Sequence, residues 1–131
     1  MMETADAVAG LGIQGVKLHH LYVAKNTPLA EEYFKGKVQT LDMKAYIQLA
    51  DDFLERIPSD VTIQRLVGDT HGNFLISPIW KASKAEITAG ITRELERRGT
   101  YQGALCNVVK NVVNNHSTAL KEKSNLHTVK I

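Results

Sequence analysis

The chain has 131 residues, of which 44% are hydrophobic and 23% are charged, and its formal net charge is +2. This size and composition are typical of one globular domain, and the small net charge excludes the dense basic field of a dedicated nucleic-acid-binding protein. The single cysteine excludes an internal disulfide framework, and no run approaches the roughly 20 apolar residues that span a bilayer, so we expect a soluble, cytoplasmic protein with no membrane contact.

The chain opens with a short helix and a buried strand. Residues 3–9 are expected to form a helix that Gly10 and Gly12 end. No basic run precedes an apolar segment here, which argues against a signal peptide. Residues 16–23 are rich in β-branched, aromatic and aliphatic side chains, which predicts a parallel strand buried on both faces.

Two helices are predicted next. Thr27 is placed as the N-cap of the first helix, with Pro28 at its first position, and Gly36 ends it. Thr40 is expected to cap the second helix, which Pro58 stops because the residue before a proline is forced out of helical geometry. The apolar residues of this second helix recur every three or four positions: Met43, Tyr46, Ile47, Ala50, Phe53, Leu54 and Ile57.

A second strand is predicted at residues 61–67. Because helices connect the two strands, we expect parallel pairing with a right-handed crossover. The loops that follow the strands, Lys25–Thr27 and Gly68–Gly72, would then share one edge of the sheet. Ligands bind at the carboxyl ends of parallel strands, so function is expected at these two loops.

The C-terminal half is expected to be rich in helix. Residues 74–80 are consistent either with a short strand or with an apolar segment packed on the core. Ser83 and Glu86 form a capping-box pattern ahead of a helix that Gly99 ends. Residues 104–131 are predicted to begin as a helix and then to fray as a polar chain end.

Four motifs occur in this order: G-V-K-L-H-H-L-Y-V-A-K-N-T-P-L-A, D-F-L-E-R-I-P-S-D-V-T-I-Q-R-L-V-G-D, L-I-S-P-I-W and R-E-L-E-R-R-G-T-Y-Q-G. Together they resemble the C-terminal part of the YhcC-type radical S-adenosylmethionine (radical-SAM) proteins, which are iron-sulfur oxidoreductase-like. The resemblance implies an α/β fold in which residues 1–103 supply short parallel strands and covering helices to a partial (β/α) barrel. Asn26, Gln64 and Ile79 depart from the family pattern, where Gly, His and Lys are expected.

The resemblance also implies cofactors that this chain does not bind alone. The full-length family is expected to hold a [4Fe-4S] cluster through a C-x-x-x-C-x-x-C motif and to bind S-adenosylmethionine at it. Cluster ligation needs several thiolates, and Cys106 is the single cysteine. We therefore expect a segment that is inactive alone, whose partner is the missing N-terminal radical-SAM portion, and whose exposed apolar surface favours self-association.

Two other functions stay open. The chain is alternatively a free-standing α/β binding module for RNA or a protein partner, with Trp80, Tyr101, Arg97 and Arg98 as an aromatic and basic surface. Packing and a charge pair at a helix end explain the same residues, and we prefer that explanation. A small enzyme with its own site at the strand ends is the remaining possibility.

Five residues are candidates for the substrate or SAM side of the site: His20, Lys25, Thr27, Arg65 and Asp69. Lys25 is suited to neutralise a carboxylate or phosphate, whereas the capping role alone accounts for Thr27. Arg65 and Asp69 are expected to pair with each other at the end of a strand.

The other titratable residues are expected to be structural. His19 and His20 should point to opposite faces of a strand, which excludes a chelating pair, and no acidic or thiol ligand has a suitable spacing to complete a metal site with His71. Cys106 is expected to be a small buried residue of a helix. The acidic residues of the helix that Pro58 stops are expected on a solvated face: Asp51, Asp52 and Glu55.

Overall fold

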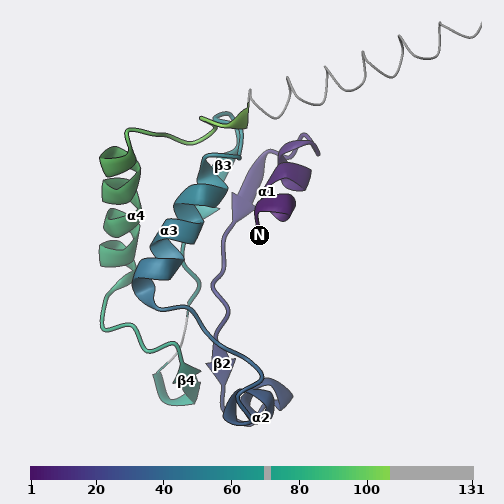
Figure 1. The fold of residues 1–131 in the computed structure, drawn as a ribbon, viewed down its shortest axis with the longest axis vertical. Helices are drawn as coiled ribbons and strands as arrows, with labels where there is room; N and C mark the ends of the chain where they lie inside the picture. Colours follow the sequence, from purple (N-terminus) through teal and green to yellow (C-terminus); the bar gives the residue numbers. More distant parts are fainter. Residues whose placement is uncertain (70–71, 107–131) are drawn as a thin grey trace, which may run out of the picture.

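The computed structural model describes residues 1–69 and 72–106, which form a small α/β fold with two two-stranded sheets (Figure 1). The elements in chain order are α1 Met2–Ala9, β1 Gly15–Lys17, β2 Val23–Ala24, α2 Pro28–Phe34, α3 Met43–Leu54, β3 Thr62–Arg65, a 3₁₀ turn Gly72–Phe74, β4 Leu75–Ser77 and α4 Lys84–Arg98. The predicted α/β class is confirmed, and most of the tail predicted from residue 104 lies outside the described residues. In the described ranges, no helix combines the length and apolar character needed to cross a membrane.

β1 and β3 form the parallel pair that the sequence predicts. Val16 lies opposite Ile63, and the Leu18 backbone N–H continues the ladder by donating to the Arg65 carbonyl at 2.8 Å. The chain passes through α3 between the two strands, and α3 contributes the largest share of the core residues. A helical crossover between strands leads to parallel pairing, which is why the pairing was predictable.

The single strand predicted at residues 16–23 is wrong, because this stretch belongs to two different sheets. β1 ends at Lys17 and β2 begins at Val23, which lies opposite Ser77 in an antiparallel pair with β4. A register shift between Val16 and Lys17 makes the β1–β3 ladder irregular near the end of β1. Residues 74–80 therefore do contain a strand. The loops after β2 and β3 leave different sheets, so they do not share one edge as predicted.

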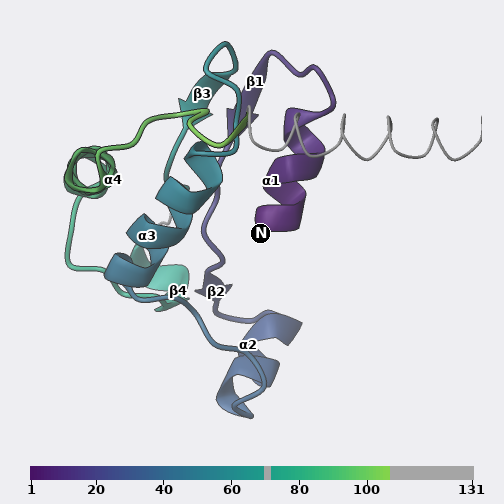
Figure 2. The ribbon, with the colours of Figure 1, turned by 45° about the horizontal axis from the view of Figure 1, so that its top comes forward.

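The core lies on one face of the β1–β3 pair. In Figures 1 and 2, α3 runs along the pair, with α4 on one side of α3 and α1 on the other. Exposure alternates along β1 and its extension: Val16 and Leu18 contribute to the core, whereas Lys17 and His19 are exposed. The core residues come from α1, α3 and α4 and from the segments next to β1 and β3: Ala5, Leu18, Tyr46, Ala50, Phe53, Leu54, Ile57, Val61, Val67, Ile87 and Ile91.

The caps predicted for α2 and α4 are confirmed. The Thr27 hydroxyl accepts a hydrogen bond from the Ala30 backbone N–H at 3.2 Å, and Ser83 and Glu86 form a reciprocal capping box at the start of α4. Gly99 ends α4 with a φ of 64°, a left-handed conformation that favours glycine. These local signals fix where α4 begins and therefore where its first turn meets the rest of the fold.

The cap predicted for α3 is wrong. Asp42, not Thr40, caps this helix, and its carboxylate accepts from the Ala45 backbone N–H at 2.8 Å. The Thr40 hydroxyl instead shares a hydrogen bond of 2.6 Å with the Ser77 hydroxyl. This bond ties the link between α2 and α3 to β4, a contact between residues far apart in the sequence.

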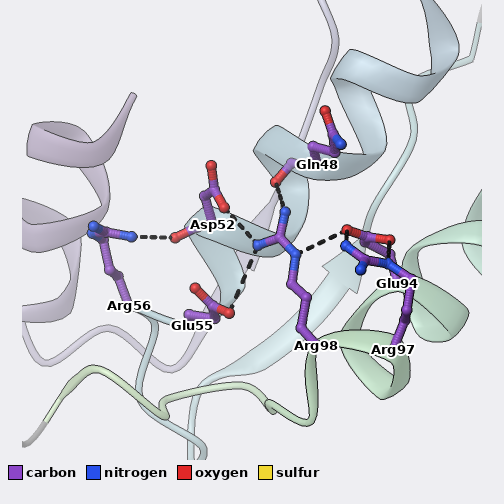
Figure 3. A network of polar contacts seen from close by, with 7 residues as sticks. All are labelled: Gln48, Asp52, Glu55, Arg56, Glu94, Arg97 and Arg98. Carbon is purple, nitrogen blue, oxygen red and sulfur yellow. Dashed lines mark hydrogen bonds and ion pairs between the residues drawn. The ribbon is translucent and has the colours of Figure 1, made fainter.

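Arg98 joins α4 to α3 (Figure 3). Its guanidinium donates to Asp52 Oδ1 at 2.6 Å and to Glu94 Oε1 at 3.0 Å, and Glu55 Oε1 lies 3.7 Å away. The prediction of a solvated acidic face is therefore wrong for Asp52 and Glu55, because both carboxylates face Arg98. This network holds the C-terminal turn of α4 on the middle of α3.

Asp51 also departs from the predicted solvated face. Its side chain is fully buried, and neither carboxylate oxygen has a hydrogen-bond partner among the described residues. The pKa of Asp51 is raised to about 7, mainly by burial; Arg98 opposes this rise, and the carboxylates of Glu94, Glu55 and Asp52 add to it. The charges that act on Asp51 lie on α3 and α4, so its protonation is coupled to the packing of these two helices.

The stability of the chain should fall as the pH rises from about 4 to about 7. The unfolded chain ionises Asp51 near its ordinary pKa of 3.8, whereas the folded chain holds the proton until about 7. The free energy of unfolding is therefore highest below pH 4 and falls as the pH rises through about 7, by at most roughly 4 kcal/mol in total. Asp51→Asn should flatten this slope in urea unfolding measured across pH. Asp60→Asn, at an exposed position, should retain it, and identical slopes in both variants would contradict this assignment.

Replacing Arg98 with Gln should lower the free energy of unfolding by about 1–3 kcal/mol, because half-buried charged hydrogen bonds would be lost. Arg97 offers the matched control, since its side chain is 70% exposed and pairs only with Glu94 among the described residues. Arg97→Gln should change the same quantity by less than about 0.5 kcal/mol. Urea unfolding at pH 7 measures both variants, and equal losses would show that Arg98 acts as an ordinary surface residue.

Candidate functional site

A cavity of about 220 Å³ lies where the end of β3, β4 and the first turn of α4 meet. Its walls are mainly apolar, with a histidine, a tryptophan and a lysine as the polar elements. The residues that matter for its chemistry are His20, Gly68, Trp80 and Lys84. The cavity thus lies beyond the carboxyl end of β3, at the position where ligands bind in parallel α/β folds.

His20 forms one wall of this cavity and is held by aromatic neighbours. Its ring centroid lies 4.5 Å from that of Trp80 and 5.7 Å from that of Tyr46. Burial and the neighbouring His19 lower the pKa of His20, so the ring is neutral near pH 7. His20 Nδ1 is buried without a hydrogen-bond partner among the described residues. The His20 ring therefore contributes to the shape of the cavity and adds no charge to it near pH 7.

Hydrogen bonds fix the two aromatic neighbours of His20. The Trp80 indole N–H donates to the Leu41 carbonyl at 3.1 Å. The Tyr46 hydroxyl donates to the Leu66 carbonyl at 2.5 Å, and burial raises the pKa of Tyr46 to about 12. Tyr46 is therefore a neutral hydrogen-bond donor that ties α3 to the segment after β3.

Asp69 and Lys84 form an ion pair beside the cavity. The predicted pairing of Arg65 with Asp69 is wrong, because Asp69 follows Gly68 and reaches the first turn of α4. Arg65 lines a separate shallow hollow, and its Nε is buried without a partner among the described residues. The structure therefore brings His20 and the Asp69–Lys84 pair to one region and leaves Arg65 beside it.

Lys25 and Thr27 belong to the second sheet and do not line the cavity. The Thr27 hydroxyl donates to the Ala24 carbonyl at 2.8 Å and caps α2, so its position is explained without a ligand. Lys25 is exposed, and its backbone N–H donates to the Phe74 carbonyl at 2.7 Å. The two loops expected to meet at one edge thus follow strands of different sheets.

His19 and Gly68 were not among the predicted site residues. A Cβ atom on Gly68 would lie 2.3 Å from His19 Cε1, so only glycine admits the ring at this distance. His19 and His20 lie between β1 and β2 rather than in a strand. The expectation that they point to opposite faces of a strand is therefore wrong, and their ring centroids lie 5.6 Å apart with 25° between the planes. The alternation of polar and apolar residues around Lys17 was the sequence signal that could have identified His19.

The remaining candidates serve structural roles. The Cys106 thiol is half-buried and donates to the Arg56 carbonyl at 2.8 Å, so the expectation of a simple buried apolar residue is incomplete. Trp80 and Arg98 of the proposed aromatic and basic surface are both engaged within the fold, whereas Tyr101 is 68% exposed. In residues 1–69 and 72–106, no three His, Cys, Asp or Glu side chains are grouped to hold a metal ion, and His71 lies outside these ranges.

Comparison with known proteins places this geometry in a family. Residues 13–97 match the model of the radical-SAM C-terminal domain. The chain is 46% identical over 103 residues to the uncharacterized protein YtqA of Bacillus subtilis. This match covers 79% of the chain and 32% of the relative. It is 43% identical over 105 residues to the uncharacterized protein MJ0486 of Methanocaldococcus jannaschii, covering 79% and 33%.

A more distant relative points the same way. The chain is 23% identical over 104 residues to the protein YhcC of Escherichia coli, which covers 79% of the chain and 34% of the relative. The chain thus spans about a third of the length of the curated relatives it matches. The matched residues include both sheets and the cavity, and they make up more than half of the chain. The chain therefore belongs to the family of radical-SAM C-terminal domains and corresponds to the C-terminal part of a YhcC-type protein.

Proposed function

We propose that this chain is the C-terminal segment of a radical-SAM iron-sulfur oxidoreductase-like protein and acts only together with a cluster-bearing portion. The observation that carries the proposal is the match to a C-terminal domain family, combined with coverage of about a third of each relative. The [4Fe-4S] cluster and S-adenosylmethionine would belong to the assembled protein. Its compartment would be the cytoplasm, where cysteines stay reduced.

The residues of this chain do not fit a [4Fe-4S] cluster. Such clusters are held by several cysteine thiolates, and the sequence contains one cysteine. That cysteine, Cys106, lies beside the C-terminal end of α3 and donates its S–H to the Arg56 carbonyl. We therefore assign no redox step to this chain, whose contribution would be the shape and polarity of a site completed by the other portion.

The fold suits the outer part of an incomplete barrel. β1 and β3 are parallel, and α1, α3 and α4 cover one face of the pair, as helices do in (β/α) barrels. The Leu18 N–H is directed to β3, and β1 has a single pairing partner within the described residues. Its other edge is therefore open to a further strand. We propose that the cluster-bearing portion supplies that strand.

Exposed apolar side chains support a missing partner surface. Leu21 is 55% exposed, Phe74 is 64% exposed and Ile79 is 71% exposed. They lie in the segment between β1 and β2 and directly before and after β4. Large exposed apolar side chains favour association with another protein surface or with a second copy of the chain.

Co-expression with the remaining two thirds of the Bacillus subtilis relative tests this proposal. We expect a 1:1 complex that, after anaerobic reconstitution with iron and sulfide and on addition of a one-electron reductant, cleaves S-adenosylmethionine to methionine and 5′-deoxyadenosine, whereas the chain alone does not. Leu21→Asp should weaken the complex at least about tenfold, because it would place a charge in an apolar contact. Size-exclusion chromatography, iron analysis and titration calorimetry measure these outcomes.

Thr92→Asp is the matched control, since it adds the same charge at an exposed position of α4. It should assemble as the unaltered chain does. Loading of the cluster on the chain alone would contradict the proposal. A monomeric chain that ignores the remainder and binds RNA in a salt-dependent manner would favour the free-standing binding module instead.

A further inference from the structure

We propose that the bare face of the β1–β3 pair is a wall of the substrate site, on which Lys17 binds an anionic group and His19 accepts a hydrogen bond. This polar face includes four exposed residues, Lys17, His19, Thr62 and Gln64. Arg65 lies opposite Lys17 in the ladder. The inference rests on the proposed function, because the face becomes enclosed only when the cluster-bearing portion completes the fold.

The polarity of this face indicates that it does not pack against a further layer of helices. The opposite face of the same strands carries Val16, Leu18 and Ile63, which pack in or against the core. A second layer of helices would require a similar apolar row on the bare face. The polar face instead offers an ammonium, an imidazole, a hydroxyl and an amide, which are groups suited to a small polar molecule.

Lys17 gives the polar face a positive charge that no carboxylate neutralises. Its ammonium group forms no ion pair with another described residue, in contrast to Lys35, Lys37 and Lys84. The polar face itself contains no acidic residue. An unpaired lysine on a polar wall favours the anionic group of a ligand, a carboxylate or a phosphate.

His19 has its acceptor nitrogen defined by the backbone. His19 Nδ1 lies 2.8 Å from the His20 carbonyl oxygen, and a carbonyl oxygen only accepts hydrogen bonds. Nδ1 therefore carries the proton in the neutral ring, and Nε2 is left with a lone pair. The ring lies against Gly68, where a Cβ would approach its Nε2 to 2.4 Å. This contact and the backbone bond together hold the imidazole in one orientation.

The distance between Lys17 and His19 sets the distance between the two ligand groups that they would bind. Lys17 and His19 are two positions apart in an extended segment, so their Cα atoms are separated by about 7 Å. A matching ligand carries an anionic group and, at about this distance, an N–H or O–H that donates to His19 Nε2. The inference is therefore a polar substrate with these two features.

Titration of the chain with inorganic phosphate and, separately, with acetate tests the anion site. We expect saturable NMR shifts centred on Lys17 and His19, and their midpoint should weaken up to about fivefold in Lys17→Gln. Lys44→Gln, which removes the same charge from an exposed position of α3, should leave the midpoint unchanged. Absent shifts, or equal shifts around Lys44, would overturn the anion site.

The protonation of His19 is tested by its imidazole ¹⁵N chemical shifts above pH 7. We expect the Nδ1–H form, and the Nε2–H form would overturn the assigned role. Gly68→Ala should displace the ring and abolish this preference while the unfolding midpoint in urea changes little. His19→Asn keeps a donor near the His20 carbonyl and removes the distal acceptor, so it separates the backbone bond from ligand contact.

The assembled protein distinguishes a substrate wall from a protein contact. In the complex with the remainder of the relative, Lys17 should stay reactive to reductive methylation, as should Lys44, while β1 amides become protected from hydrogen exchange. Lys17→Gln and His19→Asn should assemble with unchanged affinity. A protected Lys17, or loss of assembly in these variants, would overturn the inference and leave the proposed function standing. Failure of the unaltered chain to assemble would overturn both.

Discussion

Among the described residues, helices cover only one face of the β1–β3 pair, and this one-sided burial determines most properties of the chain. Val16, Leu18 and Ile63 join one core with residues of α1, α3 and α4. Successive side chains of a strand alternate between faces, so burying Val16 places Lys17 on the other side, and His19, just past the strand, is exposed as well. The same constraint thus produces a stable core and an unfilled polar face.

One-sided burial also explains why the free chain is expected to need a partner. A two-stranded parallel pair leaves backbone donors and acceptors unpaired along its outer edges. Parallel strands are normally covered on both faces within a larger sheet, whereas β1 pairs with β3 alone among the described residues. The polar face is uncovered and the outer edge is unpaired for the same reason, namely that the sheet has only two strands. Further strands from another portion would cover the face and pair the edge.

The caps of α2 and α4 and the parallel β1–β3 pairing were predictable from the sequence, whereas the second sheet and the burial of Asp51 were not. The caps at Thr27 and Ser83 depend on residues three positions away, so their signals are contained in a few letters. The break at residues 18–22 depends on β4, which lies some fifty residues later and draws Val23 into a second sheet. Asp51 reads as one more acidic residue on an amphipathic helix, and only the packing of α4 reveals that it is buried.

The cavity lies beside one of the two loops that the sequence indicated, and of the five candidate residues His20 lines it. The rule that ligands bind at strand ends led to the segment around Gly68 and Asp69, and Gly68 lines the cavity. It also led to Lys25, because one strand was assumed where the chain forms two. Val16, Lys17, Leu18 and His19 alternate between apolar and polar residues, a pattern of period two that is the sequence signature of a half-buried strand. Reading the same eight residues as a fully buried strand concealed the polar face, since a strand covered on both sides leaves no face for a ligand.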